Sequence, residues 1–593
     1  DLHSFPTRRS SDLHIALAFA SPLPAATISG TVFEDVNYGG GAGRPLSAAG
    51  VQRSDAVRVE LYRPNGAFRA STTTNSSGQF SFSVNTNTWG TGQYYVRVAN
   101  GTVISERGGC AAPRVCVAVQ TFRTDADTLP GTGTNTALPV INQVGGQDPR
   151  LVDAPSNTSS LTFTQLSAAG QTAQSVTRVN LQSNSATVNG VDFGFNFDTV
   201  VSTRDLTDCD PSAGTSYFPC QGTLRQFIIN ANALGGSLAQ AGAGQVDGID
   251  SSLPAGYETS IFMIPNGAAN PGQNTGYANQ LSSGVASIAL ASALPTLTDA
   301  NTRLDATTQT VNVGNTNTGS VGSGGVAGVD NIPLPAFPRP EVQLQAGNTT
   351  VTSSAAGQTI SGFALAQGYI AMSGANAVAR NNLVGFRADG SSDSGGAAYG
   401  IAFTGASTLI RGNYVAVNNS GIRGDSPGAG AVIAYNEVAR PSVGHSNTFD
   451  GILIINTATN AQIANNLARD QRGGGIEIGF GSGTMSNVTI TNNTARNNGY
   501  DSGATASSEP IGIAAYGYTG SGVVISRNRI ENNAGPGLLI MAASGTRATL
   551  NSFSGNGGLA IDLDPNTRDP NGLGAPQGVT YMEIGRASCR ERV

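Results

Sequence analysis

A short pattern returns seven times between residues 378 and 562, and this repetition constrains the fold more than any other feature of the sequence. Each copy contains an apolar residue, two residues of any type, an asparagine, one further residue and then a second apolar or small residue. A turn follows each asparagine, and a glycine with an aliphatic residue follows the turn. The asparagines are Asn381, Asn413, Asn436, Asn466, Asn493, Asn528 and Asn551. Such self-similarity predicts a solenoid, in which each repeat stacks on its neighbours.

The residue types within the repeats indicate which solenoid this is. Segments such as 488–495 and 523–530 are short and alternate between apolar and polar residues, which is typical of strands with one buried face. Such strands can pair only with the coils above and below them, and the asparagines then stack as a ladder of side chains inside one turn. Leucine-rich repeats fit poorly, because leucine is scarce whereas glycine and asparagine dominate.

With its repeated asparagine and Gly-Ile positions, the segment 378–562 resembles the right-handed parallel β-helix repeat family. The resemblance implies an all-β fold, in which a right-handed parallel β-helix follows a small β-sandwich domain. We divide the chain into an adapter-like start (1–13), the end of a signal peptide (14–26), a β-sandwich (27–100), a β-rich connecting region (101–197), the β-helix entry with its cap (198–346), the β-helix repeats (347–582) and an adapter-like end (583–593).

Insertions in the repeats concentrate at one corner of the coil. From the aliphatic residue after each turn to the next asparagine there are 12 to 17 residues, whereas from an asparagine to the next such aliphatic residue there are 8 to 20. The three largest insertions, 387–399, 439–450 and 498–510, lie on alternate coils. Because coils are about 4.8 Å apart, these loops should lie roughly 10 Å apart and could line a groove. Their charged and polar groove candidates are Asp389, Asp393, Arg440, His445, Asp450, Tyr500, Asp501 and Glu509.

The two ends of the sequence do not read as protein. Back-translated, residues 1–13 resemble a common sequencing-library adapter, and residues 583–593 resemble the reverse complement of the same oligonucleotide. We therefore exclude both ends from fold reasoning. On this reading Cys589 is not a natural cysteine, and the β-helix is expected to be truncated, with the natural protein continuing beyond Met582.

Several features indicate an exported protein. Residues 15–26 look like the end of an apolar signal-peptide region with a small-residue cleavage site, although a chance apolar tail is the alternative. Two close cysteine pairs, Cys110 with Cys116 and Cys209 with Cys220, are disulfide candidates in an oxidising compartment. Metal ligation is the alternative for these pairs, but neither has a histidine nearby. The sequence contains no run of 18 apolar residues, so it does not predict a membrane span.

Residues 27–100 contain alternating segments separated by turns rich in glycine or asparagine, as in a small β-sandwich. The stretches 29–37 and 75–80 resemble the Cna-B-like and carboxypeptidase-regulatory-like repeats of bacterial surface proteins. In some relatives the equivalent Asp-x-Asn loop binds calcium, so the resemblance implies Asp35 and Asn37 as oxygen ligands. A plain Asp/Asn turn is the alternative.

A short helix near 223–234 is predicted at the entry of the β-helix. Thr223 and Gln226 have the spacing of a capping box, in which each side chain pairs with a backbone N–H of the first turn. Apolar residues from Leu224 to Leu234 then share one face, and Gly235 ends the helix. The segment 222–232 resembles the entry of secreted bacterial β-helix proteins, where an amphipathic helix covers the open end of the first coil.

Two functions are compatible with the sequence. The first is an exported bacterial surface or adhesion protein that binds glycans or partner surfaces without catalysis, for which we expect no catalytic residue and no cofactor other than possible calcium. The alternative is a polysaccharide lyase or glycoside hydrolase, with Asp450 and Asp501 as the carboxylates that flank the cleaved bond. We expect Glu477 and Asp562, which alternate with aliphatic residues, to face solvent.

The expected partner is a polysaccharide or a cell-surface glycan, bound by a monomer that is secreted or held at the cell surface. Nucleic acid is not expected as a partner, because the net charge is −6 and the chain contains no lysine. Neither the identity of the glycan nor the choice between binding and cleavage follows from the fold class alone.

Overall fold

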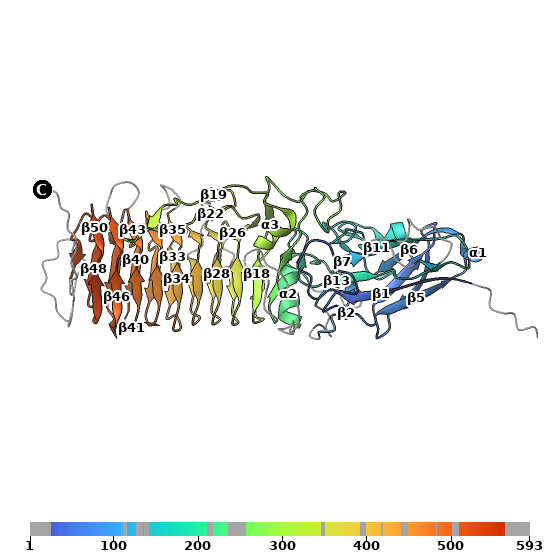
Figure 1. Ribbon diagram of the computed structural model, residues 1–593, viewed down its shortest axis with the longest axis horizontal. Helices are drawn as coiled ribbons and strands as arrows, with labels where there is room; N and C mark the ends of the chain where they lie inside the picture. Colours follow the sequence, from blue (N-terminus) through green and yellow to red (C-terminus); the bar gives the residue numbers. More distant parts are fainter. Residues whose placement is uncertain are drawn as a thin grey trace, which may run out of the picture.

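The computed structural model of this chain describes residues 25–107, 110, 115–125, 134–135, 141–209, 218–234, 256–345, 350–391, 399–416, 419–440, 449–481, 483–500 and 509–563. The molecule is elongated, with an N-terminal domain at one end and a long stack of strands forming the rest (Figure 1). The adapter-like ends, 1–13 and 583–593, lie outside the described residues, as does the leader up to residue 24.

Two sheets form the N-terminal domain and share one core. The first has the order β7–β13–β1–β12–β8, with β2 and β5 also paired to β1, and the second has the order β11–β6–β3–β4. Buried residues of both sheets, such as Ile28 and Val59, belong to one hydrophobic cluster. The strands are β1 (Ala26–Glu34), β2 (Gln52–Arg53), β3 (Arg58–Tyr62), β4 (Phe68–Thr73), β5 (Gln79–Val84), β6 (Gly92–Val98), β7 (Val119–Arg123), β8 (Thr134–Asn135), β11 (Ser175–Leu181), β12 (Thr187–Val188) and β13 (Phe193–Asn196). Helix α1 (Thr86–Trp89) and the two-stranded sheet of β9 (Val152–Asp153) and β10 (Gln171–Thr172) complete it.

The division expected at residue 100 does not separate two structural units. Strand β11 pairs with β6 over seven residue pairs, from Ser175 opposite Val98 to Leu181 opposite Gly92. Strand β13 pairs with β1, and β7 pairs with β13. The segment 119–196 therefore completes the sheets begun by residues 26–98, because β1 and β6 each pair with strands later in the chain.

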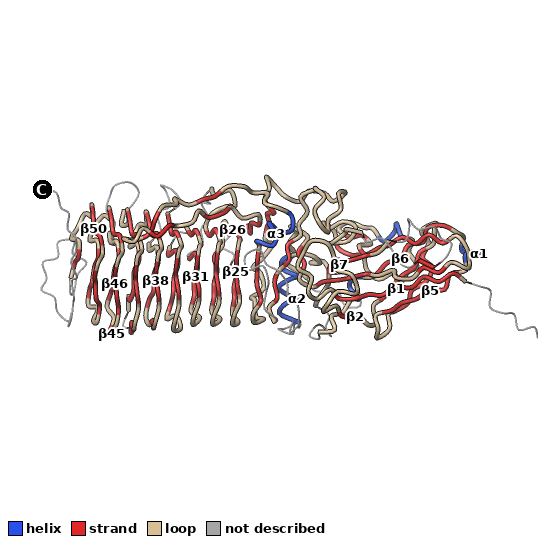
Figure 2. The backbone as a smooth tube through the Cα atoms, viewed as in Figure 1, coloured by secondary structure: helices blue, strands red, loops and turns tan. Residues whose placement is uncertain are grey.

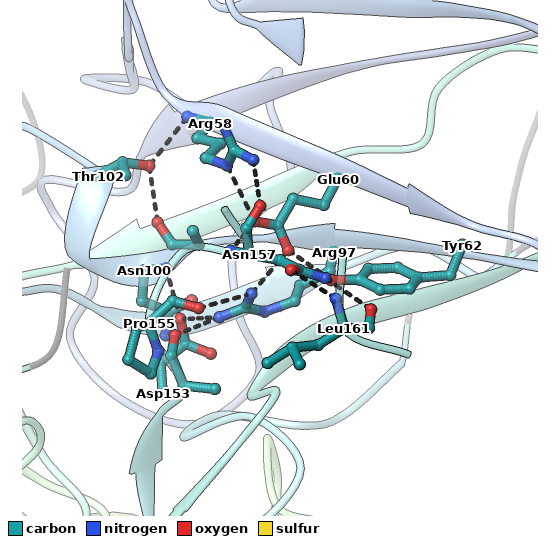
Figure 3. A network of polar contacts seen from close by, with 12 residues as sticks. Arg58, Glu60, Tyr62, Arg97, Asn100, Thr102, Asp153, Pro155, Asn157 and Leu161 are labelled. Carbon is teal, nitrogen blue, oxygen red and sulfur yellow. Dashed lines mark hydrogen bonds and ion pairs between the residues drawn. The ribbon is translucent and has the colours of Figure 1, made fainter. Parts of the chain in front are cut away.

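A buried charge network ties this domain together (Figure 3). The Arg97 guanidinium is fully buried and forms ion pairs with Glu60 at 2.7 Å and with Asp153 at 2.9 Å. Tyr62 donates a hydrogen bond to Glu60, and the backbone of Asn157 donates another. Burial acts to raise the pKa of Glu60, but Arg97 and these hydrogen bonds lower it below its usual value. Breaking one partner of such a network leaves an uncompensated buried charge, so the network stabilises the contact of β3 and β6 with the β9–β10 pair.

Helix α2 (Leu224–Leu234) covers the first coil of the β-helix. Leu224, Phe227 and Ile228 are buried in the same cluster as the β-helix core. Only half of the predicted capping box forms: the Thr223 hydroxyl accepts from the N–H of Gln226, whereas the Gln226 side chain donates to the carbonyl of Val115 and to Asn230. The Gln226 amide therefore ties the helix to the N-terminal domain instead of capping its own first turn. The parallel pair of β14 (Thr199–Val200) and β16 (Ile261–Phe262), with helix α3 (Thr307–Val313), completes this entry region.

Three long parallel sheets, which we name A, B and C, form the β-helix (Figure 2). Sheet A contains β15 (Glu258–Thr259), β18 (Thr302–Asp305), β25 (Thr359–Ser361), β28 (Val378–Arg380), β31 (Leu409–Arg411), β34 (Val432–Ala434), β38 (Gln462–Ala464), β42 (Thr489–Thr491), β46 (Val523–Ser526) and β49 (Thr546–Thr549). Sheet B contains β17 (Ala286–Ala289), β23 (Val342–Gln345), β26 (Phe363–Leu365), β29 (Leu383–Val384), β32 (Tyr414–Val415), β35 (Glu437–Ala439), β39 (Leu467–Arg469), β43 (Thr494–Arg496), β47 (Arg529–Glu531) and β50 (Ser552–Ser554). Sheet C contains β24 (Thr350–Ser353), β27 (Tyr369–Met372), β30 (Tyr399–Phe403), β33 (Ser420–Asp425), β36 (Ile452–Ile455), β40 (Ile476–Gly479), β44 (Ile513–Tyr516), β48 (Leu538–Met541) and β51 (Ile561–Asp562).

Each coil passes from sheet C to sheet A and then to sheet B. A short fourth sheet, which contains β37 (Ala458–Thr459), β41 (Thr484–Ser486) and β45 (Thr519–Ser521), lies between C and A in later coils. Aliphatic residues stack in columns inside the coil, because the register places like residues opposite each other. In sheet A, for example, Ile410, Ile433 and Ile463 lie in consecutive strands, and all three are buried. Burial of these columns from water is the main stabilising contribution.

The asparagine ladder runs inside the turn between sheets A and B. Each ladder asparagine donates its backbone N–H and its side-chain Nδ2 to the Oδ1 of the asparagine in the next coil, as Asn436 does to Asn466 at 3.0 Å each. The ladder begins at Asn382 and not at Asn381. Because Ala379 pairs with Ile410, residue 382 lies opposite Asn413, while Asn381 is exposed and adopts a φ of 55°.

A second ladder, which the sequence analysis did not find, lies in the turn between sheets B and C. The backbone of Gln471 donates to Asn498, Asn498 donates to Asn533, and Asn533 donates to Asn556. Nδ2 of Asn498 also donates to the carbonyl of Ala468 in the preceding coil. Two turns of the later coils are therefore held by buried amides, so the positions of residues next to these turns are well defined.

Residues 315–341, which we name the strap, leave the coil between α3 and β23 and cross the outward face of sheet B. Within the strap, β19 (Ser320–Val321) pairs with β22 (Phe337–Pro338), and β20 (Val326–Ala327) pairs with β21 (Ile332–Pro333). Figure 1 shows the strap beside the later coils. The turn at its far end, residues 328–331, lies near Arg527, whose guanidinium forms an ion pair with Asp330. The strap therefore connects the entry of the β-helix to a coil almost 200 residues further along the chain.

Candidate functional site

The outward face of sheet C carries the candidate site. Residues of this sheet alternate, so Ile476 and Ile478 lie in the core while Glu477 between them points outward. The register places Leu453, Glu477 and Ala514 in one outward row of consecutive strands. Glu477 is thus a carboxylate set between two apolar neighbours in its row.

Three carboxylates converge at the corner where chain from sheet B enters sheet C. Asp450 lies just before β36, Glu477 lies in β40, and Glu509 lies just before β44. One carboxylate oxygen of each lies within 4.8 Å of those of the other two. Asp450 is 7% exposed and Glu477 is 2% exposed, while Glu509 is half-buried. We name these three residues the acidic cluster.

Two glycines allow the carboxylates to approach one another. A Cβ atom at Gly474 would lie 2.0 Å from Oε1 of Glu477, and one at Gly473 would lie 2.7 Å from Oδ1 of Asp450. The N–H of Gly474 donates to the same Oδ1 of Asp450 at 3.2 Å. Any larger residue at position 474 would push the Glu477 carboxylate away, so the Gly473–Gly474 turn is part of the site.

The charges of the acidic cluster determine what it can bind. Three carboxylates this close repel one another when all are ionised, so a shared proton or a cation would stabilise the cluster. Carboxylate oxygens are the ligands that Ca²⁺ takes, and backbone carbonyls or water would have to complete the six to eight oxygens that it requires. The same carboxylates can accept hydrogen bonds from the hydroxyl groups of a ligand.

Two exposed aromatic rings lie at the two ends of the strands that carry the acidic cluster. Phe449, next to Asp450, is 40% exposed, and Phe480, directly after β40, is 53% exposed. The Arg472 guanidinium lies 5.5 Å from the centre of the Phe449 ring, and Phe480 packs edge-on against Tyr516 with ring centres 6.1 Å apart. Large exposed aromatic residues beside convergent polar groups are typical of a ligand-binding surface.

The structure brings together only some of the predicted groove residues. Asp450 and Glu509 meet in the acidic cluster, and Nη1 of Arg440 donates to the carbonyl of Tyr500, linking two insertions. Asp389 accepts hydrogen bonds from the hydroxyl and the N–H of Ser391, which lower its pKa and hold it in a local turn. Three predicted residues lie outside the described residues, namely Asp393, His445 and Asp501.

The expectation that Glu477 and Asp562 face solvent is wrong. Both point outward from sheet C, but Glu477 is 2% exposed and Asp562 is 1% exposed. The sequence signal for Glu477 was its place as a charged residue between two core isoleucines, one coil after Asp450. That signal gives the face of the sheet but not the loops that bring Asp450 and Glu509 against it.

Asp35, one of the two predicted calcium ligands, is paired with an arginine. Oδ1 of Asp35 accepts from Nε of Arg44 at 2.6 Å, and Oδ2 accepts from the Arg44 backbone at 3.1 Å. Burial raises the pKa of Asp35, and Arg44 partly opposes that rise. Asn37 is 7% exposed. A guanidinium already neutralises this carboxylate, so calcium at this loop would have to displace Arg44.

The structure joins the predicted cysteine pairs. Cys110 forms a disulfide with Cys116, and Cys209 forms one with Cys220. The Cys209–Cys220 disulfide closes a short loop just before helix α2. None of the helices in the described parts of the chain has the length and hydropathy of a membrane span.

Stacked parallel strands, inward aliphatic columns and asparagine-lined turns define a parallel β-helix. The chain is a right-handed parallel β-helix protein, and a family model described as the right-handed beta helix region matches residues 429–572. Comparison with curated protein sequences finds no match.

Several solved structures are similar to this chain at low identity. A double mutant of the periplasmic alginate epimerase AlgG is 13% identical, with 51% of this chain and 76% of that chain covered and a TM-score of 0.29. Pectate lyase Pel9A is 14% identical, with 42% and 68% covered and a TM-score of 0.26. The Dettilon tailspike protein is 17% identical with a TM-score of 0.26, and the match covers 38% of this chain and 51% of the tailspike. These similarities concern the fold alone.

Proposed function

We propose that this protein binds a polysaccharide on the outward face of sheet C, and that the acidic cluster is the centre of the binding site. The observation that carries the proposal is the convergence of Asp450, Glu477 and Glu509 between two exposed aromatic rings. Carboxylates accept hydrogen bonds from sugar hydroxyls, and aromatic faces pack against the C–H surfaces of sugar rings. A ligand would reach the cluster past Glu509, its most exposed member.

The location of the protein is part of the same proposal. Two disulfides and a leader-like start favour an oxidising environment outside the cytoplasm. A β-helix with a separate N-terminal domain would then present the sheet C face to polysaccharides as a secreted or surface-held monomer. The solved structures that are similar to this chain include a periplasmic alginate epimerase and a pectate lyase, which is compatible with a polysaccharide ligand.

Polysaccharide cleavage at the same site is the second candidate, and the short separation of the carboxylates favours it. Glycosidases that retain configuration use two carboxyl groups about 5–5.5 Å apart, one as acid and one as nucleophile. Asp450 and Glu477, on neighbouring coils, each have a carboxylate oxygen within 4.8 Å of the other and are the candidate pair. The sequence predicts Asp501 as the partner of Asp450, and Asp501 lies outside the described residues; within them, Glu477 is the candidate partner that we propose.

A single screen separates binding from cleavage. The full chain is incubated with neutral and acidic polysaccharides, with calcium or with a chelator, and reducing ends, unsaturated products and retention on each polymer are measured. Retention without new ends supports a binding protein, and product formation supports an enzyme. Phe480→Ala should weaken retention on the same polymer, whereas Phe553→Ala, a partly buried ring at the last coil of sheet B, is the control. Absence of both retention and products on every polymer would contradict the proposal.

A further inference from the structure

The N-terminal domain contains a polar groove that is separate from the acidic cluster. The groove encloses about 710 Å³, within the range of small-ligand sites. Strands β1 and β5 form its floor and pair with Ser29 opposite Ser81 and Thr31 opposite Gln79. Because Ile28 and the phenylalanines of β5 point into the core, these four polar side chains share the other face.

The groove has a wall on each side. Thr72 and Thr73, at the end of β4, form one wall together with the turn at Asn75. Asn75 is fixed, because its Oδ1 accepts from the N–H groups of Ser77 and Gln79 at 3.0 Å each.

The opposite wall belongs to the segment between β12 and β13. Oδ1 of Asn189 accepts from the hydroxyl of Ser29 at 2.7 Å, and Oδ1 of Asp192 accepts from the N–H of Thr31 at 2.9 Å. Both side chains are thereby attached to β1, so the groove is preorganised, which reduces the entropy cost of binding.

The lining is uncharged apart from one carboxylate. Asp192 is the sole ionisable residue among the groove residues, and no arginine lines the groove. Burial raises the pKa of Asp192, while the hydrogen bond from Thr31 opposes the rise. Arg53 acts on Asp192 from outside the lining, so an anionic ligand would meet a carboxylate and no cation in the lining itself, which disfavours an anion. Hydroxyl and carboxamide groups both donate and accept, which suits a ligand with many hydroxyl groups.

We infer that this groove binds a neutral saccharide, so that the protein has a second carbohydrate site in its N-terminal domain. The inference goes beyond the proposed function of sheet C, because the groove and the acidic cluster share no residue. Leu46 supplies an apolar contact for the C–H surface of a sugar ring. An extended peptide is less suited, because strand addition uses backbone groups at a sheet edge, whereas this groove lies over a paired face.

The test uses the full chain and a panel of neutral gluco-, manno- and galacto-oligosaccharides, with affinity measured by calorimetry. Ser81→Trp fills the groove from an exposed position of β5. Ser83→Trp is the matched control, because Ser83 is the next outward residue of the same strand and does not line the groove. We expect Ser81→Trp to weaken binding of the best oligosaccharide by at least about tenfold and Ser83→Trp to leave it within about twofold.

Two further variants make the result specific. Asp192→Asn keeps an oxygen for the N–H of Thr31 but loses the carboxylate, and should weaken binding by about three- to tenfold. Glu477→Gln changes the acidic cluster but no residue of the groove, so oligosaccharide binding to the groove should stay the same in this variant. The groove is therefore tested independently of the sheet C proposal. Absence of binding across the panel, equal affinities of the two tryptophan variants, or capture of an extended peptide instead of a saccharide would overturn the inference.

Discussion

Asn413 accepts two hydrogen bonds from Asn382 through a single oxygen: Oδ1 lies 3.0 Å from the backbone nitrogen and 3.1 Å from Nδ2 of Asn382. Its own Nδ2 donates to the carbonyl of Ala379 in the preceding coil. One buried amide thus satisfies three polar groups that have no water nearby, which explains why the repeat retains asparagine in this turn.

Replacing this amide should be costly. Asn413→Ala leaves the Asn382 donors and the Ala379 carbonyl without their partner, and we expect the free energy of unfolding to fall by about 2–4 kcal/mol. Chemical denaturation followed by circular dichroism measures the change. Asn381→Gly is the control, because Asn381 is exposed and its φ of 55° suits glycine, so its unfolding midpoint should stay close to that of the original protein. Equal effects of the two substitutions would argue against the ladder beginning at Asn382.

Glu437 should fix the strap on sheet B. Its carboxylate is fully buried, accepts from the N–H of Ser323, and pairs with Arg469 at 2.7 Å. Glu437→Ala leaves the partly exposed Arg469 guanidinium with only its Asp470 ion pair and the N–H of Ser323 without its acceptor, so we expect the free energy of unfolding to fall by about 1–3 kcal/mol. Limited proteolysis should then cut the strap near residue 323 faster than in the original protein. Asp330→Ala breaks the exposed pair with Arg527 and should change neither measurement. Unchanged cleavage in Glu437→Ala would show that other contacts hold the strap.

Acidic residues where the N-terminal domain meets the β-helix should make the free energy of unfolding depend on pH. Arg107 is buried and pairs with Glu34 of the N-terminal domain at 2.8 Å and with Glu258 of the first coil at 3.6 Å. Burial raises the pKa of Glu258 well above its usual value, and the nearby Asp198 raises it further, while Arg107 opposes the rise. Burial also raises the pKa of Glu34.

The direction of this pH dependence follows from the proton count. Above pH 4.5 an unfolded glutamate has lost its proton, whereas Glu258 keeps its proton until the pH passes its raised pKa. The folded state binds more protons in that window, so stability should fall as pH rises above about 4.5. Glu258→Gln should remove part of that fall in denaturation series between pH 4 and 8. If the free energy of unfolding changed with pH in the same way in the Glu258→Gln variant and in the original protein, the raised pKa of Glu258 would be contradicted.

The β-helix could be predicted because one turn repeats a buried amide and the columns repeat aliphatic residues. The single error in the ladder arose because Asn381 and Asn382 are adjacent, and only the register of Ala379 against Ile410 decides between them. The second ladder was not predicted, because Gln471 replaces asparagine in one coil and a variable insertion begins at the Asn498 position.

The acidic cluster could be predicted only in part. Asp450 and Glu509 belong to insertions at one corner, so the sequence placed them near each other. Glu477 joins them because the glycine turn at 473–474 leaves room for its carboxylate, and such a close approach depends on three-dimensional packing. The strap was not predicted at all, since residues 315–341 follow no repeat and their partners lie more than 100 residues away.

The most direct test of the central claim compares Glu477→Gln with Glu531→Gln in polysaccharide binding. Both substitutions remove one carboxylate from a β-helix strand with almost no change of shape, but only Glu477 belongs to the acidic cluster. Affinity electrophoresis of the full chain in gels that contain the best-retained polysaccharide gives the dissociation constants. We expect Glu477→Gln to weaken binding by at least about tenfold and Glu531→Gln to have no effect. Equal binding by both variants would contradict a polysaccharide site centred on the acidic cluster.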